Sequence, residues 1–443
     1  MEFLQAKQKQ DPDLFLHRMW IAGQPVMLAG YFSLIDLPQT MMLLQQQARH
    51  AADSERPLSA LASGLGERID RADEQAVFTA ISDGCLLVVP EAECFEGYLR
   101  IVPVSRTLSR SIEAPTTESV LRGSASSFNE DLDTNLGMLK KHMLSDLLRT
   151  RSYRMGKDQN RKLTLIYMEK HTDSSLLKAV CRKIEAHLDK EIPDLIALSE
   201  DVFEFPKWSL VTRFNTTELP HNASAALGQG KVVLLLDRYP FAIILPSMIT
   251  DVFSSVNDRN YPLLLANAVR LLRIIGVLAN MLMPGLYVAL VSVNPDVLRI
   301  ELAMSIAGSR EGVPYPSLVE TLLLLFVLEL TLEASIRLPK SIGPTITMVG
   351  GIILGQAVVQ ARLVSNVLII ILAATTIASF TAVGFHNAIT IRVPKYLLLL
   401  LSAIFGVLGL FVGILIVSAY LASVKSFGVP YASRWKNKRS PNG

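Results

Sequence analysis

Residues 396–424 read YLLLLLSAIFGVLGLFVGILIVSAYLASV, a run without a single Lys, Arg, Asp or Glu. Residues 363–391 lack those four residue types as well. Each run exceeds the roughly 20 apolar residues that a helix needs to cross a bilayer core. Upstream of residue 260 the chain is polar and of mixed charge. The contrast predicts a soluble region followed by a membrane region.

The composition limits what the chain can be. At 443 residues it has room for two or three domains, and 50% of its residues are hydrophobic. The net charge of +3 averages two unlike halves, and it gives no sign of a nucleic-acid partner. Residues 1–13 are polar and lack the apolar core of a secretory signal, so we expect the soluble part to stay in the cytosol. The three cysteines fit that reducing compartment.

The soluble half combines helical and strand patterns. Residues 129–148 carry apolar side chains at three- and four-residue spacing, which predicts an amphipathic helix with Ser127 as its N-cap. A second such helix is expected over residues 174–188. Short apolar runs bordered by turn residues predict strands over residues 85–90, 98–104, 163–168, 232–236 and 241–245, the last two forming a hairpin.

Helices that alternate with strands predict an α/β domain. We expect residues 1–75 to be mostly helix and loop, with one helix over residues 41–52. Residues 149–162 are basic, and we interpret them as a solvated loop, with contact to acidic lipid or to a partner as the alternative.

One short sequence occurs twice. Residues 83–89 (DGCLLVV) resemble residues 229–235 (QGKVVLL), each a glycine followed by an apolar strand. Two subdomains divided near Pro115 would explain the likeness, and so would chance similarity of two hairpins. We predict soluble subdomains over residues 1–114 and 115–262, a helical membrane domain over 263–424 and a basic tail over 425–443.

The soluble half carries no catalytic constellation. It has no glycine-rich phosphate loop, and its cysteines and histidines lack the spacing of a metal site. His171 and His221 are isolated in sequence, so we interpret them as solvated or structural. The sequence therefore predicts a protein that is not an enzyme and uses neither a metal nor a cofactor.

Five apolar stretches follow the soluble half. They predict an all-α membrane domain with about four to six crossings. The stretches cover residues 266–293, 318–336, 342–361, 363–385 and 396–424.

The second stretch carries acids at membrane depth. Glu329, Glu333 and Arg337 are each four residues apart, so they share one helical face, and Glu333 can pair with Arg337. Intramembrane carboxylates usually face a bundle interior or water, which makes these residues and Glu320 candidates for the lining of an ion path. An amphipathic helix in the membrane interface and a structural ion pair between helices are the alternatives.

Small residues mark the third and fifth stretches, where GxxxG steps allow close helix approach in lipid. The candidate packing positions are Gly350, Gly351, Gly355, Gly409 and Gly413. Gln356 and Gln360 lie one helical turn apart, and they either pack or face a pore.

The charges flanking the last stretch conflict. Arg392 and Lys395 form a basic loop before it, and a basic tail follows it. The positive-inside rule places both in the cytosol, which one continuous crossing between them forbids. Either the last stretch doubles back or one of the two signals is misleading.

Several collinear motifs resemble one family. They are RSIEAPTTE at 110–118 with Arg122-Gly123, FNEDLDTN at 128–135, GKVVLLLD at 230–237 with Pro240-Phe241 and Pro246, VPYP at 313–316 with Glu320, EASIRLP at 333–339 with Ile342-Gly343, and VGGIILGQA at 349–357. In their order and in the soluble-then-membrane layout they resemble the A subunit of bacterial spore germinant receptors, the GerA-type family.

The resemblance implies a non-enzymatic subunit in the inner membrane of an endospore. It implies a transporter-like B subunit and a lipoprotein C subunit as partners, with nutrients triggering cation release and germination. It also implies a homo-oligomer that conducts ions, to which the acidic helix and the glycine-rich helix would contribute. A stand-alone secondary transporter and a membrane-anchored scaffold are the alternatives, although no inverted repeat is visible for the transporter.

Overall fold

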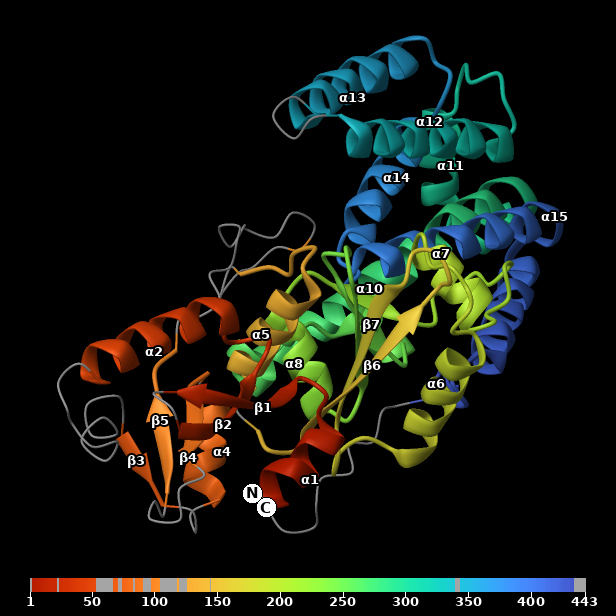
Figure 1. The fold of residues 1–443 in the computed structure, drawn as a ribbon. Coiled ribbons are helices and arrows are strands. Elements are labelled where there is room, and N and C mark those ends of the chain that lie inside the picture. The colour runs from red at the N-terminus through yellow and green to blue at the C-terminus, as the bar shows by residue number, and fades with distance from the viewer. Residues whose placement is uncertain are drawn as a thin grey trace.

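A computed structural model describes the chain. The described residues are 2–21, 24–52, 67–70, 74–82, 84–90, 97–103, 118, 126–143, 145–338 and 343–433. Within them, two five-stranded sheets make up the N-terminal half, and helices followed by one short two-stranded sheet make up the rest (Figure 1). The prediction of an α/β region followed by an all-helical region is therefore confirmed.

The first unit is a five-stranded antiparallel sheet with the order β1-β2-β4-β5-β3. One core cluster of buried apolar side chains, from Leu4 to Ile101, holds it together. Its strands are β1 (Leu14–Ile21), β2 (Gln24–Tyr31), β3 (Glu67–Ile69), β4 (Leu86–Pro90) and β5 (Tyr98–Ile101), and its helices are α1 (Glu2–Gln10), α2 (Leu37–Ala52) and α4 (Glu74–Ser82).

The second unit is also a five-stranded antiparallel sheet, with the order β6-β7-β9-β10-β8. Its strands are β6 (Leu148–Met155), β7 (Arg161–Met168), β8 (Asn215–Thr217), β9 (Val232–Leu236) and β10 (Ala242–Leu245). Its helices are α5 (Leu132–His142), α6 (Ser174–Ala186), the single turn α7 (Leu195–Ala197) with the π-helical η1 (Leu198–Val202), α8 (Pro220–Gly228) and α9 (Ile249–Phe253).

Both faces of the second sheet are buried, which explains its uninterrupted apolar strands. Alternate residues of a strand point to opposite faces. Val232 and Leu234 belong to the core cluster shared with α6 and η1, whereas Val233 and Leu235 belong to the cluster shared with α5 and α8. Helices thus cover the sheet on both sides, and the apolar run of β9 is a central strand rather than a membrane segment.

The two sheets repeat one order of elements. In each, a hairpin is followed along the chain by a helix, an edge strand, a second helix and a second hairpin. In the sheet, the second hairpin lies between the first hairpin and the edge strand. Gly84 and Gly230 precede β4 and β9 with the same left-handed φ of 85°. The sequence likeness at 83–89 and 229–235 therefore falls on equivalent strands. Pro115 lies outside the described residues, so the boundary at 114/115 stays a prediction.

Three predictions for the soluble half were wrong in detail. Residues 14–31 form the β1–β2 hairpin, not helix and loop. The helix predicted over 129–148 is α5, which is shorter because Asp131, not Ser127, caps it by accepting the Thr134 N–H at 3.0 Å. The basic segment 149–162 is part of the β6–β7 hairpin, not a loop; β6 is an edge strand, and most of its side chains are exposed or half-buried.

The helical half begins after a short 3-10 turn, η2 (Val256–Asn260). Two helices in the described part are long and apolar enough to cross a membrane, at Leu263–Val293 and Thr390–Ser423. The elements are α10 (Leu263–Val288), η3 (Ala289–Val293), η4 (Pro295–Val297), α11 (Ile300–Ser309), α12 (Ser317–Arg337), α13 (Gly343–Gln360), α14 (Asn366–Ser379) and α15 (Phe385–Ser423).

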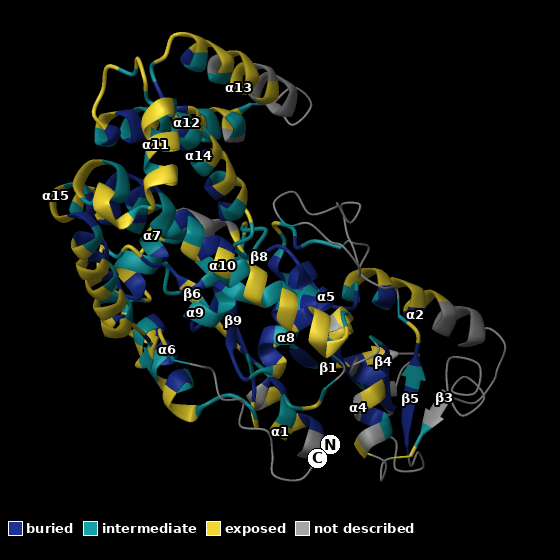
Figure 2. Cartoon of the chain, turned by 180° about the vertical axis from the view of Figure 1, so that it is seen from behind, coloured by how far each residue is buried: buried dark blue, intermediate teal, exposed yellow. Residues whose placement is uncertain are grey.

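Helices α11 to α13 extend away from the sheets and expose much of their surface (Figure 2). No described residue of α11 is buried, and its Ile300 and Met304 are exposed. Soluble monomers rarely expose so much contiguous apolar surface. These helices therefore have a surface that lipid or other chains can cover.

The run over residues 363–391 is not one membrane span. Its helix α14 has 14 residues and measures about 21 Å, short of a bilayer core. The Ser379 and Thr381 hydroxyls donate to backbone carbonyls one turn earlier, and Gly384 adopts a left-handed φ of 87° before α15 starts. These side-chain hydrogen bonds and the glycine end one helix and start the next.

The last apolar stretch doubles back at Gly406. There the backbone of α15 leaves the helical region, with φ 61° and ψ −139°, a conformation open only to glycine. Asn294 accepts the Val407 N–H at 3.0 Å, and Leu398 packs where a side chain on Gly413 would start. A straight helix would hold Leu398 and Gly413 about 22 Å apart. Arg392 and Lys395, which lie within α15 and not in a loop, and Lys425 just after α15 therefore lie toward the same end.

Candidate functional site

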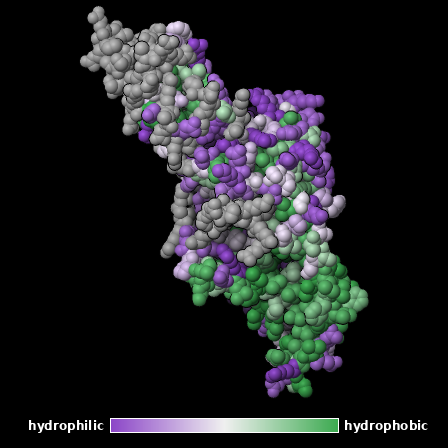
Figure 3. Space-filling model, turned by 90° about the horizontal axis from the view of Figure 1, so that it is seen from below, coloured by the Kyte–Doolittle hydropathy of each residue, from purple (hydrophilic) through white to green (hydrophobic). Residues whose placement is uncertain are grey.

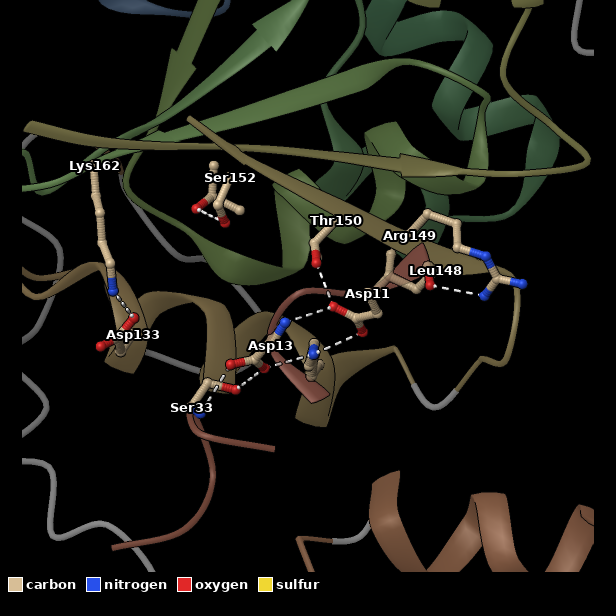
Figure 4. Close-up of polar contacts among 11 residues, drawn as sticks. Asp11, Asp13, Ser33, Asp133, Leu148, Arg149, Thr150, Ser152 and Lys162 are labelled. Carbon is tan, nitrogen blue, oxygen red and sulfur yellow. Dashed lines mark hydrogen bonds and ion pairs between the residues drawn. The ribbon is translucent and has the colours of Figure 1, made fainter. Parts of the chain in front are cut away.

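A buried charge cluster joins the two soluble units (Figure 4). The ammonium nitrogen of Lys140, on α5, lies 3.1 Å from Asp11 Oδ2 and 2.6 Å from Asp13 Oδ2. The three side chains are 6%, 5% and 7% exposed, so water screens little of their attraction. The same nitrogen lies 3.4 Å from the centre of the Tyr31 ring. Burial, together with the charges of Asp11 and Asp13, raises the pKa of the Tyr31 phenol.

Neutral donors stabilise both carboxylates of the cluster. Ser33 donates its hydroxyl to Asp13 Oδ2 at 2.6 Å and its N–H to Oδ1 at 3.1 Å. Thr150 of β6 donates its hydroxyl to Asp11 Oδ1. The Lys140 contacts span 129 and 127 residues of chain, so no local pattern could have revealed them. The cluster is a charge bridge that fixes the first unit on the second.

Glu118, the last residue of the RSIEAPTTE motif, is bound to the second unit. The Glu118 carboxylate accepts the Thr217 hydroxyl at 3.0 Å, the Glu218 N–H at 2.8 Å and the Asn222 amide at 2.7 Å. Burial raises the pKa of Glu118, while these hydrogen bonds oppose the rise. The sequence reasoning quoted this residue in a motif but gave it no role.

The second unit is fastened to the helical half at three places, the first of which lies at the start of α10. Asp258 of η2 receives two hydrogen bonds from Arg273, at 2.6 and 2.9 Å, with Arg270 at 3.6 Å. Burial raises the pKa of the Asp258 carboxyl, but the Arg273 hydrogen bond outweighs it, and the net pKa lies below the usual value. A bidentate pair of this kind sets the direction in which α10 leaves the sheet.

The second fastening lies at the start of α15. Asn387 contacts Asn215 at 3.5 Å and Thr212 at 3.4 Å. Asn215 in turn donates to Asp251, whose carboxylate also lies 2.7 Å from the buried Lys231 ammonium. The polar network therefore runs from the sheet edge β8 into the helix.

The third fastening is a strap that follows α15. Residues 425–433, expected to belong to a basic tail, form the hairpin β11 (Lys425–Ser426) and β12 (Val429–Pro430) on the second unit. Ser426 donates its hydroxyl to the Arg213 carbonyl at 2.6 Å, and Arg213 donates to the Lys425 carbonyl at 3.1 Å. The Phe427 ring lies 5.1 Å from that of Phe203 and 5.3 Å from that of Phe205. The rest of the tail lies outside the described residues.

Phe427→Ala is expected to loosen the strap. Phe427 holds a positive φ of 51°, which a bulky side chain tolerates only where packing over-determines it. Losing the ring contacts costs about 1–2 kcal/mol and should raise local opening about tenfold. Trypsin cleavage after Lys425 in the native protein, followed by mass spectrometry, measures that opening. Phe380→Ala, which removes an exposed ring, is the control; equal cleavage in both variants would contradict the packing role.

The structure separates the four acidic-helix candidates. Glu320 is 0% exposed and accepts the Ser365 N–H at 2.5 Å, at the N-terminus of α14. Arg310 lies 3.5 Å from its other oxygen, and Tyr287 lies 2.9 Å from the Ser365 hydroxyl. Glu320 therefore ties α12 to α10, α11 and α14, where the helix dipole favours its charge.

Glu329 contacts α15 and not its neighbours on α12. Its carboxylate lies 2.8 Å from Lys395 Nζ and 3.5 Å from Arg392 Nη1, and it accepts the Tyr396 hydroxyl at 3.2 Å. Arg392 and Lys395, which the sequence placed in a basic loop, lie within helix α15 and are the counter-charges of Glu329. Glu333 and Arg337 pair with each other at 2.7 Å, as the spacing predicted, and they are 59% and 78% exposed.

The predicted glycine and glutamine positions also fall into two groups, one packed and one exposed. Gly409 and Gly413 lie at the bend of α15, where a side chain would collide with Leu401 and Leu398. On α13, a side chain at Gly350, Gly351 or Gly355 would meet nothing within 4 Å of the described residues, and Gln356 and Gln360 are exposed. Packing or a pore lining on α13 stays a prediction that needs another chain.

Comparison with known proteins extends these observations. Residues 4–441 match the family described as Bacillus/Clostridium GerA spore germination protein. This chain belongs to the GerA family. The match runs through both the sheets and the helices, and the resemblance seen in the motifs is confirmed.

Two similar proteins of the family are named as spore germination proteins. The chain is 35% identical over 324 residues to spore germination protein GerLA of Bacillus cereus, covering 73% of this chain and 66% of that protein. It is 31% identical over 384 residues to spore germination protein A1 of Bacillus subtilis (strain 168), covering 85% and 77%. The chain thus spans about two thirds of the length of GerLA.

A solved structure was also matched. It is the crystal structure of the N-terminal domain of the A subunit of the Bacillus megaterium spore germinant receptor GerK3, with a TM-score of 0.41, 15% sequence identity, and coverage of 56% of this chain and 93% of that chain.

Proposed function

We propose that this GerA-family chain is the A subunit of a nutrient germinant receptor in the inner membrane of an endospore. Its soluble half would lie on the cytosolic side and act with a transporter-like B subunit and a lipoprotein C subunit. Family membership over residues 4–441 carries the proposal. The chain would work without enzymatic activity, metal or cofactor, through contacts between its soluble units and its helices.

We further propose that the helices form or gate a cation-conducting path in a homo-oligomer. The supporting observation is Glu329, a carboxylate in an apolar helix whose charge is shared with Lys395 and Arg392. Intramembrane acids of this kind mark ion routes. In the arrangement described, the two cations hold α12 against α15; their withdrawal would free the carboxylate to attract a cation.

The three fastenings suggest how a signal would reach the gate. Asp258, Asn387 and Phe427 connect the second unit to the start of α10 and to both ends of α15. Because α15 also carries Lys395 and Arg392, a shift of the second unit would move the counter-charges of Glu329. This is the mechanical route that the proposal requires.

Glu329→Gln is expected to lower nutrient-triggered potassium release from spores at least about tenfold, a change of ~1.4 kcal/mol in the barrier. Glu333→Gln is the matched control, because this acid lies on the same helix but pairs with Arg337 on an exposed face, away from Lys395 and Arg392. Equal protein levels in the spore membrane must be shown by immunoblot. Unchanged release in a well-expressed Glu329→Gln/Glu333→Gln protein would contradict the ion path.

The alternatives predict other outcomes. A scaffold whose helices serve only as anchors should tolerate Glu329→Gln if the protein still inserts. A stand-alone transporter should take up substrate in liposomes without B or C subunits. Deleting the chain and testing nutrients one class at a time would assign the trigger, since loss of one response names the nutrient class.

A further inference from the structure

The second arm of α15, after Gly406, presents one apolar stripe to the outside. Its exposed side chains recur at three- and four-residue spacing, so they share a helical face. They are Leu408, Phe411, Val412, Leu415 and Ile416. Apolar surface gathers over one end of the molecule and gives way to polar surface elsewhere (Figure 3).

A loop of the second unit is bound at the end of that stripe. The Tyr420 hydroxyl accepts the Leu210 N–H at 2.8 Å, and it lies 3.5 Å from the Ser209 hydroxyl. Val211 packs with Val424 in the same place. Residues 206–211 are therefore fixed to the last turn of α15, where the apolar helix ends.

This loop carries the most exposed aromatic residue of the described chain. Trp208 is 94% exposed, and its neighbour Leu210 is 44% exposed. Exposing an indole ring to water costs hydrophobic free energy. A fully exposed tryptophan on an ordered loop therefore points to a binding surface. Lys207 beside it is 73% exposed and lies 3.2 Å from Glu200.

We propose that residues 206–210 dock on phospholipid headgroups, with the Trp208 ring inserted at the water–hydrocarbon boundary. The inference rests on the proposed membrane placement of the helices. Indole rings prefer this depth because they combine an apolar body with one N–H donor. The loop is bound at the end of the apolar arm of α15, so a bilayer that covers Leu415 and Ile416 has its boundary near Trp208. The contact would place the second unit directly against the membrane surface.

Single-tryptophan proteins test the contact. The chain has three tryptophans. Trp20→Phe/Trp435→Phe leaves Trp208, and Trp208→Phe/Trp435→Phe leaves Trp20, which is 67% exposed on β1 of the first unit and serves as the matched control. Both full-length proteins are reconstituted in phosphatidylcholine–phosphatidylglycerol vesicles, with either brominated or plain acyl chains.

Trp208 is expected to emit at shorter wavelength than Trp20, to lose most of its emission in brominated vesicles and to resist aqueous iodide. Trp20 should show the reverse. Iodide quenching of Trp208 equal to that of Trp20 would overturn the proposal by placing the loop in water. A Trp208 that neither quencher reaches would overturn it too, by showing a protein contact.

Flotation of the vesicles separates this proposal from the one on which it rests. A chain that fails to float with lipid overturns the membrane placement, and the loop contact falls with it. A chain that floats but keeps Trp208 open to iodide overturns the loop contact alone.

Discussion

Gly406→Ala is expected to destabilise the bend of α15 and the strap that follows it. The glycine holds φ 61° and ψ −139°, and a Cβ there would collide with the Asn294 side chain that accepts the Val407 N–H. A side chain forced into this conformation costs about 1–3 kcal/mol, and losing the Asn294 hydrogen bond adds about 1 kcal/mol. The strain and the collision disappear only if α15 straightens at this position.

The measurement is the thermal unfolding temperature of the detergent-purified protein, together with trypsin cleavage after Lys425. A straightened α15 would pull the strap from the second unit, so the unfolding temperature should fall and the cleavage should rise together. Gly308→Ala, at a helical position with nothing within 4 Å, is the control and should change neither. A Gly406→Ala protein as stable as that control would show that the fold-back does not depend on the glycine.

Lys140→Met is expected to destabilise the contact between the soluble units by about 3–5 kcal/mol. The substitution keeps the apolar length of the side chain but leaves Asp11 and Asp13 buried without a cation. The cost is the uncompensated charge rather than lost packing. Hydrogen–deuterium exchange of β1 and α5 in the purified full-length protein reports it, since both elements should exchange faster.

Two further variants check the cause. Lys162→Met removes a half-exposed lysine that pairs with Asp133 at 3.4 Å, and such surface pairs contribute about 0–1 kcal/mol. It should leave the exchange unchanged. Lys140→Met combined with Asp13→Asn should recover part of the loss because it removes one stranded charge. No recovery would mean that Lys140 acts through its packing on Tyr31.

Local sequence patterns predicted the elements in which the apolar residues form a clear run or recur at a regular spacing. The hairpin of β9 and β10 follows from two uninterrupted apolar runs, and the helix α6 follows from apolar residues at three- and four-residue spacing. The β1–β2 hairpin was missed because His17 and Arg18 interrupt its apolar residues. The pairing of Glu333 with Arg337 was predicted for the same reason of local spacing.

The interactions that cross the fold could not be predicted in this way. Glu329 and Lys395 are 66 residues apart, and each looked like part of a separate pattern, an acidic face and a basic loop. The bend of α15 at Gly406 was indicated in the sequence only by the conflict between the two groups of basic residues. A glycine within an apolar run is usually interpreted as a helix-packing position, so it did not predict the bend. The structure resolved the conflict through Asn294, a residue with no motif around it.

The repeated order of strands and helices has an evolutionary consequence. Two sheets built as β1-β2-β4-β5-β3 and β6-β7-β9-β10-β8 point to one ancestral unit that was duplicated in tandem. The second copy then became bound to the helices through Asp258, Asn387 and Phe427, and mutations at those positions would disturb the helices as well as the sheet. The first copy is attached through the Lys140 cluster. Sequence change should therefore accumulate faster on the first copy, which can vary without disturbing the helices.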